Sequence, residues 1–116
     1  MTRQLVTWCC LLVIVGLVGC GGPEERKNKY RIKAQEYIEA GNFPKARVAL
    51  RNVLKIDPKD FEAYFLYAEV EEKEKNWRNA FAHYQHVVEL SPDHERALVK
   101  LGKFYLQGRI DDKAHE

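Results

Sequence analysis

Two histidines and a glutamate have the spacing in this sequence that most resembles a metal site. His83, His86 and Glu89 follow one another at intervals of three residues, so on a helix they would share one face. Imidazole and carboxylate groups bind zinc, but structural zinc sites usually draw four ligands into a closed geometry. A solvated helix face is the simpler interpretation, and we predict neither a metal nor a cofactor.

No constellation of residues in the sequence indicates catalysis. The chain has no glycine-rich phosphate loop, no HExxH motif and no Ser-His-Asp set, which are the common signatures of phosphate binding, metalloproteases and nucleophilic catalysis. The run 71–75 alternates acidic and basic residues, as solvated helix faces usually do. We therefore predict that the protein is not an enzyme and takes no small-molecule substrate.

Charge and composition exclude two further classes of protein. The 19 Lys and Arg residues against 17 Asp and Glu leave a net charge of +2, which is well below the excess usual for binding nucleic acid. Three cysteines cannot all pair within one chain, so a disulfide scaffold is excluded. The length of 116 residues suits one small domain.

Cys20 is the one candidate for covalent modification. It follows an apolar run from Leu5 to Val18, which is preceded by a single charge, Arg3. This layout is typical of a secretory signal peptide. The run is shorter than the roughly 20 apolar residues that a membrane-spanning helix needs, so we expect cleavage rather than spanning.

The four residues that end this segment, Leu17, Val18, Gly19 and Cys20, resemble the lipobox of bacterial lipoproteins. The resemblance implies a signal peptide over residues 1–19, diacylglycerol on the Cys20 thiol and a short linker over residues 20–26. It also implies attachment to the bacterial cell envelope, facing the periplasm. Gly21 stands where an inner-membrane retention signal would place Asp, which favours the outer membrane. An uncleaved anchor and simple secretion remain alternatives.

The rest of the chain repeats with a period of 34 residues. Small, apolar and proline residues recur in register: Ala34, Ala68 and Gly102; Ala46, Ala80 and Ala114; Val53 and Val87; Pro58 and Pro92. A fixed period of this length is the signature of a helical repeat. We therefore predict an all-α fold over residues 27–116, divided into units 27–60, 61–94 and an incomplete 95–116.

This pattern resembles the tetratricopeptide repeat (TPR), a unit of two antiparallel helices, A and B. Besides the small residues, the match rests on Tyr30, Tyr37, Leu50, Tyr64, Tyr84, Leu98 and Tyr105; Lys33 and Glu71 depart from it. The resemblance implies a solenoid of two full repeats, followed by a third helix A and the first residues of its helix B. Small residues allow the helices to cross closely, and Asn42 and Asn76 are plausible N-caps of the two B helices.

In that family the inner faces of the A helices form a groove for a peptide or partner helix. The resemblance places the following residues in a partner-binding groove: Arg31, Gln35, Ile38, Phe65, Glu69, Glu72, Arg96, Val99 and Lys103, with Asn28, Glu62 and Leu106 beside them. Phe65 has two interpretations of equal weight. It is either an exposed binding anchor or a packing residue between neighbouring A helices.

The first repeat carries an excess of basic residues close to the predicted anchor: Arg26, Lys27, Lys29, Arg31 and Lys33. Basic residues that reach a membrane surface attract anionic headgroups. A solvated helix that serves solubility is the favoured alternative.

Together these features predict a noncatalytic, lipid-anchored scaffold that binds unidentified protein or peptide partners. A weaker similarity to TPR lipoproteins of exosortase and exopolysaccharide (PEP-CTERM) systems suggests a role in polysaccharide export or protein sorting. The alternative is a structural subunit of an outer-membrane assembly or secretion machine. Residues 98–106 would leave an apolar face uncovered, so we expect either a piece of a longer array, which we favour, or self-association.

Overall fold

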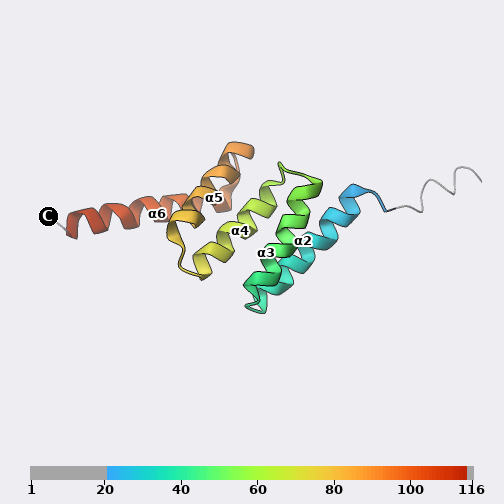
Figure 1. The fold of residues 1–116 in the computed structure, drawn as a ribbon. Helices are drawn as coiled ribbons and strands as arrows, with labels where there is room; N and C mark the ends of the chain where they lie inside the picture. Colours follow the sequence, from blue (N-terminus) through green and yellow to red (C-terminus); the bar gives the residue numbers. More distant parts are fainter. Residues whose placement is uncertain (1–20, 115–116) are drawn as a thin grey trace, which may run out of the picture.

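The computed structural model describes residues 21–114, and side chains as far as residue 112, as a row of α-helices without strands (Figure 1). The helices are α2 (Pro23–Glu39), α3 (Phe43–Ile56), α4 (Phe61–Lys73), α5 (Trp77–Leu90) and α6 (Glu95–Ala114). They confirm the predicted all-α helical-repeat fold. The predicted signal peptide and Cys20 lie outside the described residues.

Local capping explains where several helices begin. The Asn42 side chain accepts a hydrogen bond from the Lys45 amide at 3.3 Å, as predicted, and Asp60 caps α4 by accepting from the Ala63 amide at 2.9 Å. Asn76 also precedes its helix but makes no side-chain cap. Each capping oxygen satisfies an amide that has no partner within the first helical turn.

The two helical hairpins turn at residues in the left-handed backbone region. Gly41 has φ +73°, and Lys75, at the same place in the second repeat, has φ +63°. Glycine adopts this conformation freely, whereas a side chain bearing Cβ is strained there. The second turn is therefore made with a less suitable residue than the first.

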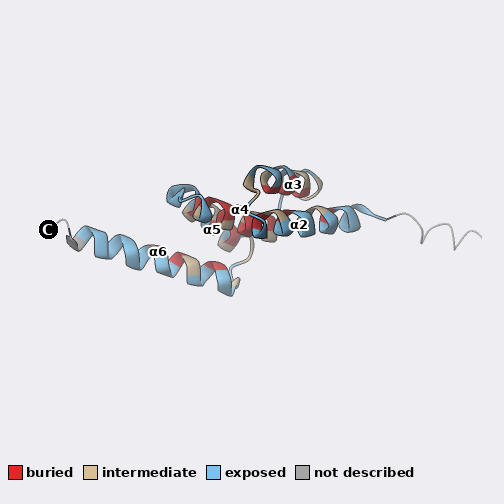
Figure 2. Cartoon of the chain, turned by 90° about the horizontal axis from the view of Figure 1, so that it is seen from below, coloured by how far each residue is buried: buried red, intermediate tan, exposed pale blue. Residues whose placement is uncertain are grey.

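Two hydrophobic cores follow one another along the row and share α4. The first joins α2, α3 and one side of α4, with Leu50, Val53 and Val70 fully buried. The second joins the other side of α4 to α5 and α6, around Phe65 and Tyr84. Figure 2 shows buried residues along all the described helices, with α4, in the middle of the row, the most buried. The small residues predicted at the crossings are fully buried in the first two repeats: Ala34, Ala46, Ala68 and Ala80.

The third repeat differs from the prediction. Instead of a helix A, a turn and the start of a helix B, residues 95–114 form one continuous helix that passes through Gly108. Its outer half extends beyond α5 (Figures 1 and 2). Tyr105, predicted to fill a crossing, is 62% exposed. In the first two repeats the turn is followed by a helix whose apolar side chains pack back on helix A, and the described residues after Gly108 carry no comparable apolar set.

Candidate partner-binding surface

The residues predicted to line a groove lie on α2, α4 and α6, and those of α4 and α6 are held together by ion pairs. Lys100 Nζ lies 2.7 and 3.0 Å from the two carboxylate oxygens of Glu72. Arg96 Nη2 lies 3.9 Å from Glu69 Oε1. We call this joined surface of α4 and α6, together with Trp77 at the adjoining start of α5, the inner face. The predicted groove carboxylates Glu69 and Glu72 are therefore both paired with basic side chains of α6.

The electrostatics of the inner face favour a charged Glu72. Burial acts to raise its pKa, but the hydrogen bonds from Lys100 and from the Tyr84 hydroxyl, at 2.7 Å, outweigh burial and lower the pKa. At Glu69 burial prevails over the nearby Arg96 and Lys100, and the pKa is raised. Burial and the adjacent Glu72 also raise the pKa of Tyr84, so its hydroxyl keeps its proton and donates.

Phe65 is a packing residue and not an exposed anchor. Its side chain is 1% exposed and lies edge-on to Tyr84, with ring centroids 5.4 Å apart. The His94 ring is 5.1 Å away, and the Arg96 guanidinium lies 4.1 Å above the Phe65 ring, within the range of a cation–π contact. Of the two interpretations left open by the sequence, packing is therefore correct.

The α2 residues of the predicted groove take no part in the junction between α4 and α6. Ile38 is buried in the first core, and Gln35 is exposed. Arg31 donates to the Asn28 side-chain oxygen at 2.7 Å and lies 3.7 Å from Asp60.

A small hollow of about 290 Å³ lies between side chains of α4 and α6. Four of the predicted groove residues line it together with two neighbours: Phe65, Glu69, Arg96 and Val99, with Glu95 and Lys100. Val99 is 58% exposed, so its side chain offers an apolar contact at the surface.

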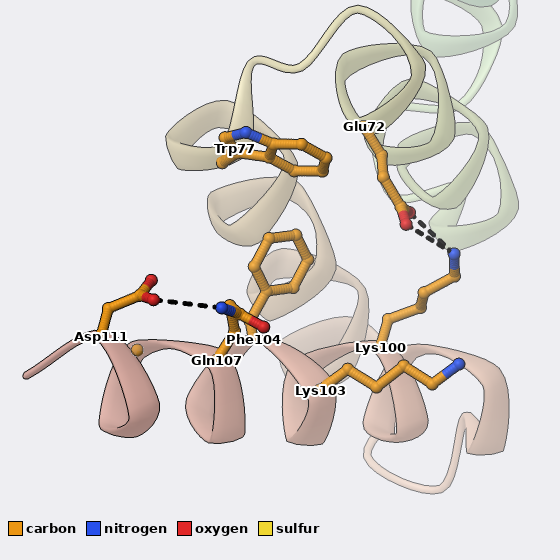
Figure 3. A pocket seen from close by; sticks show the side chains of 8 residues that line it. Glu72, Trp77, Lys100, Lys103, Phe104, Gln107 and Asp111 are labelled. Atoms are coloured by element: carbon orange, nitrogen blue, oxygen red, sulfur yellow. Dashed lines mark hydrogen bonds and ion pairs between the residues drawn. The ribbon is translucent and has the colours of Figure 1, made fainter. Parts of the chain in front are cut away.

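A larger hollow of about 670 Å³ adjoins it and shares Lys100 (Figure 3). Trp77, from the first turn of α5, and Phe104, from α6, form its apolar wall with ring centroids 6.2 Å apart. Its polar lining includes Glu72, Lys103, Gln107 and Asp111, and Gln107 donates to Asp111 at 3.1 Å. The hollow therefore combines an aromatic wall with charges of both signs.

Sequence reasoning found only Glu72 and Lys103 among the lining residues of the larger hollow. Asp111 reaches it because α6 continues past Gly108, where a turn was predicted. Trp77 could have been noticed in the sequence, because it is a large aromatic residue directly after the predicted cap Asn76 of a B helix. In the structure its side chain is 52% exposed.

The basic residues of α2 do not form one exposed patch. Lys27 is 8% exposed, and its ammonium lies 3.1 to 3.2 Å from Glu24, Asp57 and Asp60. Burial would lower the Lys27 pKa, but these three carboxylates raise it. Lys27 is thus buried and paired, and it cannot make the contact with lipid headgroups that one interpretation of the sequence required. The members that remain exposed are Arg26, Lys29 and Lys33.

The histidines of α5 do not converge on a metal site. His86 Nδ1 lies 3.1 Å from Glu89 Oε2 at the surface. His83 is partly buried, with its ring stacked on Tyr67 at a centroid distance of 5.5 Å, and burial lowers its pKa. Within residues 21–114, no group of three His, Cys, Asp or Glu side chains is placed to hold a metal ion.

Comparison with known proteins gives two findings. Residues 33–95, more than half of the chain, match the family model described as Tetratricopeptide repeat. The Type IV pilus assembly protein PilF of Pseudomonas aeruginosa is 26% identical over 117 aligned residues, which cover 90% of this chain and 46% of the relative. The chain thus spans less than half the length of that curated relative. Among the described helices, none has both the length and the apolar character to cross a membrane.

Proposed function

The chain belongs to the tetratricopeptide repeat family, whose members bind other proteins, and from this we propose a noncatalytic scaffold that receives its partner on the inner face of α4 and α6. The observation that carries the proposal is the hollow walled by Trp77 and Phe104. Concave sites with an aromatic wall and a few placed polar groups are typical of ligand recognition, and exposed tryptophans are enriched among binding hot spots.

The lining residues suggest what kind of segment would fit. An apolar side chain of the partner would contact the exposed Trp77 ring and Phe104. Lys103 is exposed on the same side of α6 and would attract an acidic neighbour of that side chain. The two hollows share Lys100, so a short peptide or helix could extend from one to the other along α6.

We also propose that the scaffold is tethered to the bacterial envelope, with the outer membrane as the favoured location, through a lipid on Cys20. The proposal is supported by the four residues ending at Cys20 and by the start of α2 at Pro23, which would keep the repeats near the membrane surface. Mass spectrometry of the mature protein from a bacterial host should find Cys20 as the first residue, with added acyl mass. A different first residue, or Cys20 without lipid, would contradict the anchor; Cys20→Ser is the matched control.

A second candidate is a structural subunit of an envelope assembly machine. It is favoured by the 26% identity to the Type IV pilus assembly protein PilF. Polysaccharide export or protein sorting remains a proposal from the sequence alone. The identity of the partner distinguishes these processes, because each would yield a different set of cross-linked envelope proteins.

Crosslinking in living cells followed by mass spectrometry tests the inner face. Trp77→Ala and Lys103→Glu should each lose the specific partner of the wild type, whereas Val48→Ala, at an exposed site on α3, should retain it. Phe65→Ala is unsuitable as a probe because Phe65 is buried in the core. Equal recovery of the partner by all four proteins would exclude the inner face as the binding site.

A further inference from the structure

One side of α6 is apolar and uncovered, although the matching side of α2 is buried. Leu98 and Leu106 are 44% and 61% exposed, and Gly102 between them has open space where a Cβ would lie. Two repeat periods earlier, Ala34 and Ile38 occupy the positions of Gly102 and Leu106 and are 0% and 6% exposed, because α3 packs over them. Within residues 21–114 this side of α6 is therefore a helix-packing surface that no other described helix covers.

The spacing of residues on this side is symmetric about Gly102. Glu95, Leu98, Gly102, Leu106 and Arg109 are separated by three, four, four and three residues, so they lie along one face of the helix. The outermost two carry opposite charges. We call these five residues the open face.

We propose that the open face binds the open face of a second copy of this chain, with the two α6 helices antiparallel and crossing at Gly102. In that arrangement Leu98 lies against the partner's Leu106, and Glu95 lies beside the partner's Arg109. A two-fold axis makes every such contact occur twice. Glycine at the crossing lets the two helix backbones approach closely, as Ala34 and Ala46 do within the first repeat.

Charge complementarity is the reason for choosing a second copy as the occupant. An antiparallel two-fold pair places each Glu95 near an Arg109, whereas a parallel pair would place like charges together, which is unfavourable. The arrangement also depends on α6 continuing through Gly108, since a turn there would remove Arg109 from the face. The interface would cover the uncovered leucines and Glu95, which also lines the edge of the small hollow, and would leave Trp77 and Lys103 of the inner face free for another partner.

The first test compares self-association of apolar-face variants. Sedimentation equilibrium of the full chain in density-matched detergent should show a monomer–dimer equilibrium, weak because one helix face buries little area. Leu106→Glu should weaken dimerisation by about tenfold or more, because it places a charge in the apolar interface. Ile32→Glu, at a similarly exposed site on α2, should leave it unchanged. A monomeric wild type, or equal association of both variants, would overturn the proposal.

The second test exchanges the charges. Glu95→Arg and Arg109→Glu should each weaken the dimer, by about fivefold, because each creates two like-charge contacts. The double variant restores opposite charges in the antiparallel pair and should dimerise within about twofold of the wild type. Circular dichroism checks that all variants keep their helix content. Failure of the double variant to recover while its helices are intact would exclude this antiparallel arrangement.

Discussion

Among residues 21–114, Lys75 is the one non-glycine residue with a positive φ. Its φ of +63° lies in the region that glycine adopts without strain, and Gly41 holds the matching place in the first repeat. Lys75→Gly should therefore raise the free energy of unfolding, by about 1 kcal/mol, in chemical denaturation. Gln85→Gly, an exposed site inside α5, should lower it by up to about 1 kcal/mol. A neutral or destabilising Lys75→Gly would show that the turn is not strained.

We expect His83 to make the free energy of unfolding depend on pH. Its folded pKa lies below the ordinary 6.5 because burial disfavours the charged ring. On acidification through pH 6.5 the unfolded chain therefore takes up a proton that folded His83 resists, and the free energy of unfolding falls. His83→Phe should flatten this fall between pH 7 and the lowered folded pKa. An NMR titration that gives the folded ring a pKa at or above 6.5 would contradict the prediction.

The two asparagines predicted as helix caps show what residue type alone can and cannot predict. Asn42 caps α3 as expected. The Asn76 amide instead donates to Glu71 at 2.9 Å, and that carboxylate also receives Arg47 from α3 at 2.6 Å. Asn76 therefore bonds to the buried carboxylate of Glu71 instead of capping α5. Because Arg47 of α3 positions this carboxylate, no local sequence pattern could have predicted the bond.

At the scale of helices, Glu72 is expected to control how firmly α6 docks on α4. Its carboxylate accepts from both Lys100 and Tyr84, so Glu72→Gln should lower the free energy of unfolding by about 1 kcal/mol, a modest value because solvent reaches the pair. Hydrogen exchange should accelerate more in α6, which loses the contact directly, than in α2, whose amides respond only to the lower global stability. Lys55→Gln, an exposed site on α3, is the control.

The pH dependence supplies a second check on Glu72. Because its folded pKa is lowered, the charged carboxylate contributes stability above the unfolded value of 4.5, and this contribution disappears as pH falls through the lowered folded pKa. The difference between wild type and Glu72→Gln should therefore shrink in acid. A constant difference down to pH 3 would show that the charge of Glu72 is not what stabilises the junction.

The presence of helices could be predicted from the sequence. That the third repeat lacks the turn found in the first two could not. The period of 34 depends on local spacing of small and apolar residues, and it predicted the helical repeats to which α2 to α5 belong, although α2 begins at Pro23, inside the predicted linker 20–26. The turn expected near Gly108 depends on a following helix that packs back on helix A, which is a nonlocal condition. The same difference explains why Asp111, which reaches the larger hollow only because α6 continues past Gly108, was not among the predicted groove residues.

At the scale of the whole molecule, α4 couples the two cores. Its Val70 belongs to the first core and its Phe65 to the second, and repeat arrays gain much of their stability from such shared interfaces. Although the cores contain different residues, we expect them to unfold together, because unfolding either one uncovers a side of α4.

This coupling predicts that a cavity in the first core also lowers the stability of the second core. Val70→Ala should lower the free energy of unfolding by about 2 kcal/mol when followed by Trp77 fluorescence, although Trp77 lies beside the second core. Trp8→Phe makes Trp77 the sole tryptophan, and Ile32→Ala at an exposed site should have little effect. If far-UV circular dichroism shifts while the Trp77 transition stays in place, the cores unfold separately and α4 does not transmit the loss.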